Sequence, residues 1–249
     1  MRKIYFFVAA IFVIMAAALG WFLPLAAFNI DDQINEGKQQ ELDIERVNLS
    51  YRDDLTIAQK MEIINNPYQY EDTIELDKGI FLTEEEVTAI VNDFMNDFTG
   101  YNKVYIDDAQ MIFVTPMLIN LTNNRGTTVI WYVEVWIPEG EWYVSFSIDD
   151  KTGAILKIDI NGYAGAWDSL IFDFYSSSNP NELICERYRN AIYNQYSSRI
   201  NAKFVTYHLV EDTYDYDYAN YVLIFRDGKN ETFEISLEIS IESGHIGTI

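Results

Sequence analysis

Residues 128–160 read TVIWYVEVWIPEGEWYVSFSIDDKTGAILKIDI, and this stretch decides the fold class. It contains three runs rich in β-branched and aromatic residues, separated by two short segments whose Pro, Asp and Gly are typical of turns. The runs predict strands over Thr128–Ile137, Glu141–Ile148 and Ala154–Ile160. Short connections between consecutive strands indicate an antiparallel meander.

The first of these strands has two chemically different faces. Trp131, Val133 and Val135 share one face, because successive side chains in a strand point to opposite sides, and Tyr132, Glu134 and Trp136 share the other. Such alternation is typical of a sheet that covers a core with one face only.

A helix predicted immediately upstream provides the partner for that face. Thr83 and Glu86 form a capping box, and Gly100 has the position of a C-terminal cap. Apolar side chains between them repeat with helical spacing, at Val87, Ile90, Val91, Phe94, Met95 and Phe98. We expect the sheet to present one face to this helix.

The C-terminal part repeats the same order of elements. Asn179-Pro180 predicts the start of a second helix, and a second meander follows, with strands expected over Phe204–Val210, Ala219–Arg226, Thr232–Ile241 and His245–Ile249. FSIDDKTGAI (146–155) aligns with ISIESGHI (239–246) through Ile148/Ile241 and Gly153/Gly244. This similarity indicates an internal duplication.

The N-terminal end has a different character. Ile4–Phe28 is a run of 25 residues without a charged side chain, and as a helix it would extend about 37 Å, more than the hydrocarbon core of a bilayer. Arg2 and Lys3 precede the run, which places the N-terminus in the cytoplasm. A cleaved signal peptide ending near Ala27 is the alternative. In both cases the rest of the chain lies outside the cytoplasm.

Together these patterns predict an α+β protein, with a single N-terminal transmembrane helix followed by two helix-plus-antiparallel-sheet modules. The expected segments are a cytoplasmic tip and anchor (1–30), a stalk with a short helix that begins at the capping box of Thr56 and Gln59 (31–70), a first module (71–162), a linker (163–179) and a second module (180–249).

The first module resembles the PepSY-type family. The resemblance rests on LTEEEVTAIVNDF (82–94) and on the strand-Asp-Thr-Gly-strand sequence made by Tyr143–Ile148, Asp149, Thr152-Gly153 and Ile155. It covers residues 80–160, whereas in the second copy Glu242 and Ser243 replace the Asp and Thr. The resemblance implies a secreted or membrane-anchored bacterial protein that inhibits a peptidase or binds a partner in a regulatory role.

Composition excludes several classes of function. The formal charge of −22 argues against nucleic acid as a partner, because a surface this negative repels phosphate backbones. Cys185 is the single cysteine, so no intramolecular disulfide can form. Its position on the apolar side of a predicted helix indicates a buried side chain rather than a nucleophile.

No catalytic motif is found in the sequence. His208 and His245 lie on separate predicted strands, and acidic pairs such as Asp149/Asp150 are expected by chance among 39 acidic residues. The most unusual segment is DTYDYDY (212–218), in which Tyr214, Tyr216 and Tyr218 would share one face of an extended chain. These tyrosines are candidate contact residues for a partner protein; a solvated loop and a Ca²⁺ site are the alternatives.

The sequence therefore predicts a non-enzymatic, membrane-tethered protein that binds or regulates another membrane or cell-surface protein outside the cytoplasm. We expect no metal and no cofactor. Inhibition of an extracellular peptidase is the alternative hypothesis, and a hydrolase that uses acidic residues is a third.

Overall fold

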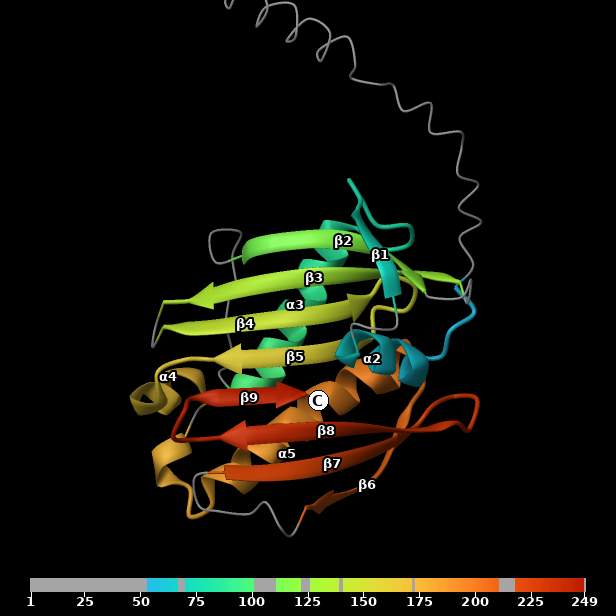
Figure 1. Ribbon diagram of the computed structural model, residues 1–249. Coiled ribbons are helices and arrows are strands. Elements are labelled where there is room, and N and C mark those ends of the chain that lie inside the picture. The colour runs from blue at the N-terminus through green and yellow to red at the C-terminus, as the bar shows by residue number, and fades with distance from the viewer. Residues whose placement is uncertain are drawn as a thin grey trace, which may run out of the picture. The chain divides into compact units, whose positions relative to one another are not determined.

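The computed structural model describes residues 53–66, 70–100, 111–121, 126–138, 141–171, 173–210 and 218–248. Its strands form one antiparallel sheet in the order β1-β2-β3-β4-β5-β9-β8-β7-β6 (Figure 1). The strands are β1 (Tyr70–Glu75), β2 (Met111–Leu121), β3 (Thr127–Ile137), β4 (Trp142–Asp149), β5 (Ile155–Asn161), β6 (Lys203–Leu209), β7 (Tyr218–Arg226), β8 (Thr232–Ser240) and β9 (His245–Thr248). The longer helices are α2 (Ile57–Asn65), α3 (Glu84–Thr99) and α5 (Pro180–Arg199), and the short ones are η3 (Ala164–Ala166), α4 (Trp167–Leu170) and η4 (Phe174–Ser176).

The helix starts predicted from capping residues are confirmed. Thr56 and Thr83 each complete a capping box, with Gln59 and Glu86 respectively. The side chain of Asn179 caps α5, and Pro180 occupies its first turn. Local hydrogen-bonding chemistry therefore defines where all three helices begin.

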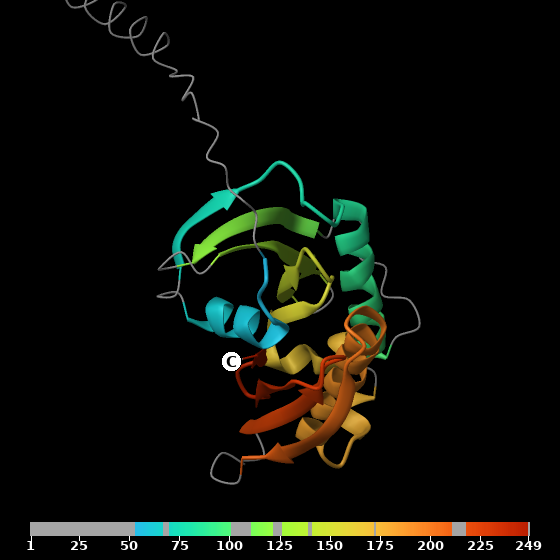
Figure 2. The same cartoon turned by 90° about the vertical axis from the view of Figure 1, so that its right-hand side faces the viewer.

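The long helices occupy opposite faces of the sheet. α3 and α5 pack against each other on one face, and α2 lies on the other face, against β5 and β8 (Figure 2). On the α3 side, Phe94 meets Phe146 of β4 edge to face at 5.7 Å and Tyr188 of α5 at 5.9 Å. The predicted alternation of β3 is confirmed, because Trp131, Val133 and Val135 are buried whereas Trp136 is 36% exposed.

The expectation of two separate helix-plus-sheet modules was wrong. The final strands of the two halves, β5 and β9, pair with each other through Asp159↔Gly247, Ile160↔Ile246 and Asn161↔His245, which makes the sheet continuous. An unpaired strand edge exposes a row of backbone donors and acceptors, and this pairing satisfies the inner edges of both halves. Alternating hydrophobicity shows which face of a strand is buried but does not identify the strand beside it.

The segment predicted as a linker joins the halves in a compact form. It contains η3, α4 and η4, and Trp167 and Phe174 are buried, whereas Tyr163 and Tyr175 are exposed. Trp167 stacks on Phe174 at 5.1 Å and lies 4.8 Å from Trp142 at the start of β4. Aromatic packing therefore holds the connection against the first half of the sheet.

Within the described ranges, no helix combines the length and apolar character needed to cross a membrane. The apolar segment 4–28, for which we predicted a transmembrane helix, and the first part of the predicted stalk lie outside these ranges.

Phe94 provides a test of the shared helix layer. Replacing it with alanine removes a fully buried ring and should lower the free energy of unfolding by about 3–5 kcal/mol. Phe113→Ala is the matched control, because that ring is 40% exposed and its loss should cost less than about 1 kcal/mol. Urea unfolding of the full chain in a non-ionic detergent measures both changes. Equal losses would contradict the packing described above.

Candidate functional site

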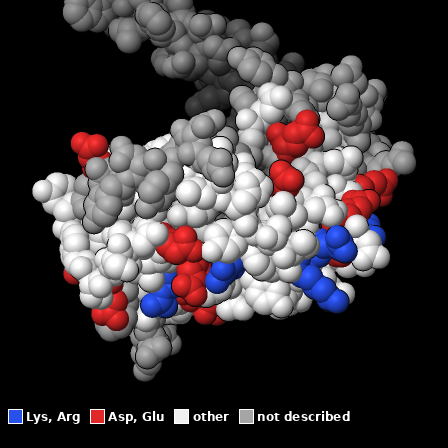
Figure 3. All heavy atoms as spheres, turned by 90° about the horizontal axis from the view of Figure 1, so that it is seen from below, with Lys and Arg blue, Asp and Glu red and all other residues white. Residues whose placement is uncertain are grey.

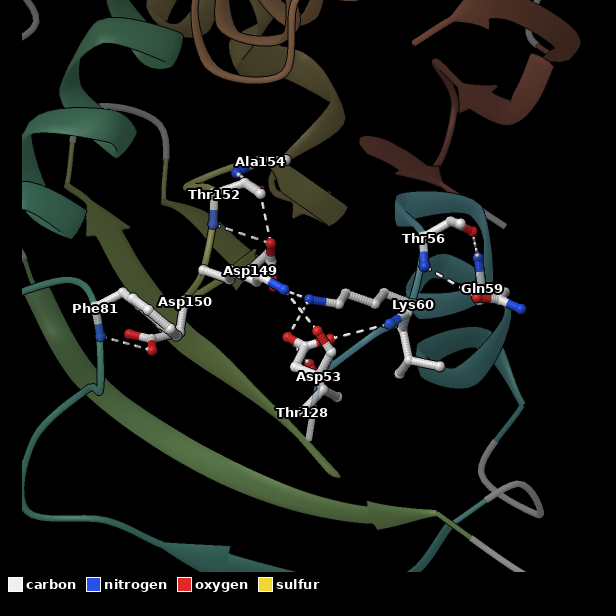
Figure 4. A network of polar contacts seen from close by, with 12 residues as sticks. Asp53, Thr56, Gln59, Lys60, Phe81, Thr128, Asp149, Asp150, Thr152 and Ala154 are labelled. Atoms are coloured by element: carbon white, nitrogen blue, oxygen red, sulfur yellow. Dashed lines mark hydrogen bonds and ion pairs between the residues drawn. The ribbon is translucent and has the colours of Figure 1, made fainter. Parts of the chain in front are cut away.

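A buried lysine on α2 is the centre of a polar network. The ammonium of Lys60 lies 2.5 Å from Asp53 Oδ2 and 2.5 Å from Asp149 Oδ1, and these three side chains are at most 1% exposed. Thr128 on β3 donates a further hydrogen bond to Asp53 Oδ2 at 3.2 Å (Figure 4). The network connects the first described residue, α2 and the β4–β5 hairpin.

Asp149 also closes the hairpin between β4 and β5. Its Oδ2 accepts hydrogen bonds from the backbone N–H of Thr152 at 3.0 Å and from the Thr152 hydroxyl at 2.6 Å. Gly153 follows with φ +73°, a left-handed conformation that glycine adopts without steric cost. The two oxygens of Asp149 thus have separate structural roles, one in the turn and one on Lys60.

The neighbouring Asp150 has a different set of partners. Its carboxylate accepts from the backbone N–H groups of Ile80, Phe81 and Leu82 at 3.0–3.2 Å and from the indole N–H of Trp131 at 2.8 Å. The contact is close, since a Cβ added at Gly79 would lie 2.3 Å from Asp150 Oδ1. Asp150 therefore holds the segment that leads into α3.

Asp149 and Asp150 are thus bound within the fold and do not form a facing pair of catalytic acids. Buried carboxylates are tolerated when a cation or several hydrogen-bond donors satisfy them. Asp149 pairs with Lys60, and Asp150 accepts from four N–H groups. The sequence assigned Asp149 to a turn, which is confirmed, but treated the acidic pair as a chance occurrence.

A cleft of about 250 Å³ lies next to the Lys60 network. Four parts of the chain line it: the start of α2, the β4–β5 turn, the end of α5 and the β7–β8 turn. Besides Lys60, the cationic side chains of Lys151, Arg199 and Lys229 line this space, and Leu55, Ile57 and Ile200 provide apolar walls. We call this space the basic cleft.

Two of these cations are held in place by neighbouring groups. Lys151 donates from its ammonium to the backbone carbonyl of Asp53 at 2.6 Å, and Arg199 donates from Nε to Gln195 Oε1 at 2.9 Å. Burial lowers the pKa of Arg199, and the charges of Asp93 and Glu86 act in the opposite direction. Arginine remains protonated despite such shifts, so Arg199 carries a positive charge in the cleft.

The sequence-predicted contact residues are only partly described. Tyr214 and Tyr216 lie outside the described residues, and Tyr218 is the first residue of β7, paired with Ser240 of β8. Burial raises the pKa of Tyr218, and the charge of Glu238 adds to that effect. Tyr218 does not line the basic cleft.

The other predicted candidates have unremarkable positions. His208 is exposed on β6, and His245 begins β9 with its Nδ1 2.8 Å from Asn161 Oδ1. Cys185 is buried on α5, as predicted. In the part of the chain that the structure describes, no group of three His, Cys, Asp or Glu side chains could hold a metal ion.

Sequence reasoning did not identify Lys60, although a signal was present. Lys60 lies among Ile57, Met61 and Ile64, on the apolar side of a short amphipathic helix. A lysine at such a position requires a buried anion. The sequence could not show that Asp149, 89 residues away, provides one.

Comparison of the chain with protein-family models, with curated proteins and with solved structures gave no match. The PepSY-like resemblance therefore remains a prediction from residues 80–160.

Lys60→Met tests the network. This change leaves two buried carboxylates without a cation and should lower the free energy of unfolding by about 3–5 kcal/mol. Lys157→Met is the matched control, because Lys157 is 31% exposed, lies 3.3 Å from Asp159 and should contribute less than about 1 kcal/mol. Urea unfolding measures both. Adding Asp53→Asn and Asp149→Asn to Lys60→Met should recover part of the loss; no recovery would mean that packing rather than charge dominates.

Cys185 gives a prediction about reactivity. Burial raises the pKa of its thiol to about 12, and Glu182 acts in the same direction, so at pH 8 the reactive thiolate is almost absent. An aromatic disulfide reagent should therefore label the folded chain at least about 100-fold more slowly than the urea-unfolded chain. Similar labelling rates in the two states would show that Cys185 is accessible.

Proposed function

We propose that this chain is a non-enzymatic binding protein, tethered to a membrane by its apolar N-terminal segment, which recognises a partner protein outside the cytoplasm. The observation that carries the proposal is the basic cleft, where four separate parts of the chain bring cationic and apolar side chains together. Such a mixture is typical of recognition sites, in which apolar walls provide contact area and a few polar groups provide orientation.

The buried polar side chains have structural partners within the fold, which supports a binding function rather than catalysis. Asp149 and Asp150 have their carboxylate oxygens occupied by donors within the fold. The thiol of Cys185 is buried and protonated. The chemistry that remains accessible at the cleft is a set of hydrogen-bond donors on Lys151, Arg199 and Lys229.

The route of the chain supports a role for the tether. In the sequence, the segment after the apolar run continues to Asp53, which binds Lys60, and the nearby residues Leu55–Ile57 line the cleft. Tethering a binding site at a membrane raises its effective concentration toward partners in the same membrane. A regulator of membrane neighbours gains from this effect.

A photo-crosslinking amino acid at position 228 tests the proposal in living cells. Gly228 lines the cleft, is exposed and has room for a side chain, so the crosslinker there leaves the three cations in place and should give a defined adduct with one membrane or cell-surface protein. The control position is Lys78, which is exposed and lines a different cavity. Mass spectrometry identifies the partner. An extracellular peptidase as the partner would favour the inhibitor hypothesis.

The two positions separate a specific contact from chance collisions. No adduct at position 228 in any growth condition, or the same adducts at both positions, would overturn the proposal.

A further inference from the structure

The basic cleft stands out against the charge of the whole protein. The chain has a formal charge of −22, yet Lys151, Arg199 and Lys229 all line one space of about 250 Å³. Figure 3 shows basic side chains in a few small groups, one of them on the right-hand side, where the β7–β8 turn lies in Figure 1. None of the three forms an ion pair with a residue that the structure describes.

Two acidic residues also line the cleft, and both are engaged. Asp149 binds Lys60 with one oxygen and Thr152 with the other. Asp227 Oδ1 accepts from the backbone N–H groups of Lys229 and Glu231 at 2.8 and 2.9 Å, which fixes the β7–β8 turn. The cationic groups therefore have spare donors, whereas the acceptors are largely in use.

The guanidinium of Arg199 is held in a defined place. Gln195 fixes its Nε, and its Nη1 lies against Gly153, where an added Cβ would come within 2.6 Å. A guanidinium positioned in this way offers a planar pair of donors that matches the two oxygens of a carboxylate. Lysine ammonium groups on two sides add point charges without directional demands.

The apolar walls determine what kind of anion fits. Leu55, Ile57 and Ile200 border the same space and are only partly buried. An inorganic ion leaves these side chains without contacts, whereas an anion attached to an apolar group covers them and removes apolar surface from water. The cleft is also too small for more than one or two residues of a peptide.

We propose that the basic cleft binds the C-terminal carboxylate of a partner polypeptide, with the apolar side chain of its last residue against Leu55, Ile57 and Ile200. The carboxylate pairs with Arg199 and Lys229, and Lys151, which lines the same space, adds a third cation. Capture of a chain end by converging donors is an established mode of peptide recognition. This inference rests on the proposed function and specifies the chemistry of the same site.

Two peptides that differ only at the C-terminus test it. Acetyl-Ala-Ala-Leu as the free acid and as the amide are added in millimolar excess to the full chain in a non-ionic detergent, at matched ionic strength. A ligand that binds only the folded state raises the midpoint of thermal unfolding, and the dose dependence gives an apparent Kd. The free acid should bind at least about tenfold more tightly than the amide, because the amide cannot form charge-assisted hydrogen bonds.

Variants assign the effect to the cleft. Lys229→Gln and Arg199→Gln should each raise the apparent Kd of the free acid at least about tenfold, and Lys78→Gln should leave it unchanged. Lys229 has an exposed side chain, so its variant keeps the test valid even if Arg199→Gln unfolds. Sodium acetate and sodium phosphate are added in separate arms.

The outcomes decide between ligands. Equal binding of acid and amide, or no binding of either, overturns the proposal. Acetate that binds as tightly as the tripeptide would also overturn it, because the apolar walls would then contribute nothing. Phosphate that binds more tightly than the tripeptide would overturn it as well. A crosslinked partner combined with equal binding of acid and amide would leave the proposed function in place and reject only the C-terminal carboxylate. Selective binding of the free acid without any crosslinked partner would reject the proposed function but leave the C-terminal carboxylate as the ligand of the cleft.

Discussion

One buried ammonium determines how the N-terminal part of the described chain attaches to the sheet. Lys60 contacts Asp53, which precedes α2, and Asp149, which ends β4, and all three side chains are removed from solvent. A buried charge pair contributes little net stability, because desolvation offsets much of the attraction, but loss of one partner is costly. The main effect of the network is therefore to fix the position of α2 on the sheet. α2 has to lie where Lys60 reaches both carboxylates, and this places one wall of the basic cleft.

A second constraint makes the two halves one structure. β5 and β9 are each the last strand of a helix-plus-meander unit, and they pair antiparallel in the middle of the sheet. Each is preceded by a tight turn with a glycine at positive φ, Gly153 at +73° and Gly244 at +68°. The backbone of Gly162 also donates to Gly244 at 2.9 Å. The inner edge strand of each half is therefore paired with the inner edge strand of the other half, and neither is left exposed.

The sequence was informative wherever structure depends on nearby residues. The capping boxes of Thr56 and Thr83, the cap at Asn179 and the turn at Asp149 all use partners within a few residues, and each was predicted. The order of the strands in the sheet was not predictable. Alternation with a period of two shows which face of a strand is buried but does not show which strand pairs with it. The same limit explains the wrong expectation of two separate modules.

The candidate site could not be predicted for a related reason. Its cations, Lys151, Arg199 and Lys229, come from a turn, a helix end and a second turn, and none is part of a recognisable motif. Each of them alone is an ordinary surface residue of a charged protein. Only the strand order, which brings the β4–β5 and β7–β8 turns to the same end of the sheet, makes them neighbours.

The position of α2 connects the basic cleft to the N-terminal part of the chain. Residues at the start of α2 form one wall of the cleft, whereas Arg199 and Lys229 belong to the body of the protein on the other side. A ligand that contacts both walls binds only when α2 is docked through Lys60. Docking of α2 makes ligand binding more favourable by a certain free energy. By thermodynamic linkage, ligand binding stabilises the docked position of α2 by the same amount. Occupancy of the basic cleft and docking of α2 are therefore thermodynamically coupled.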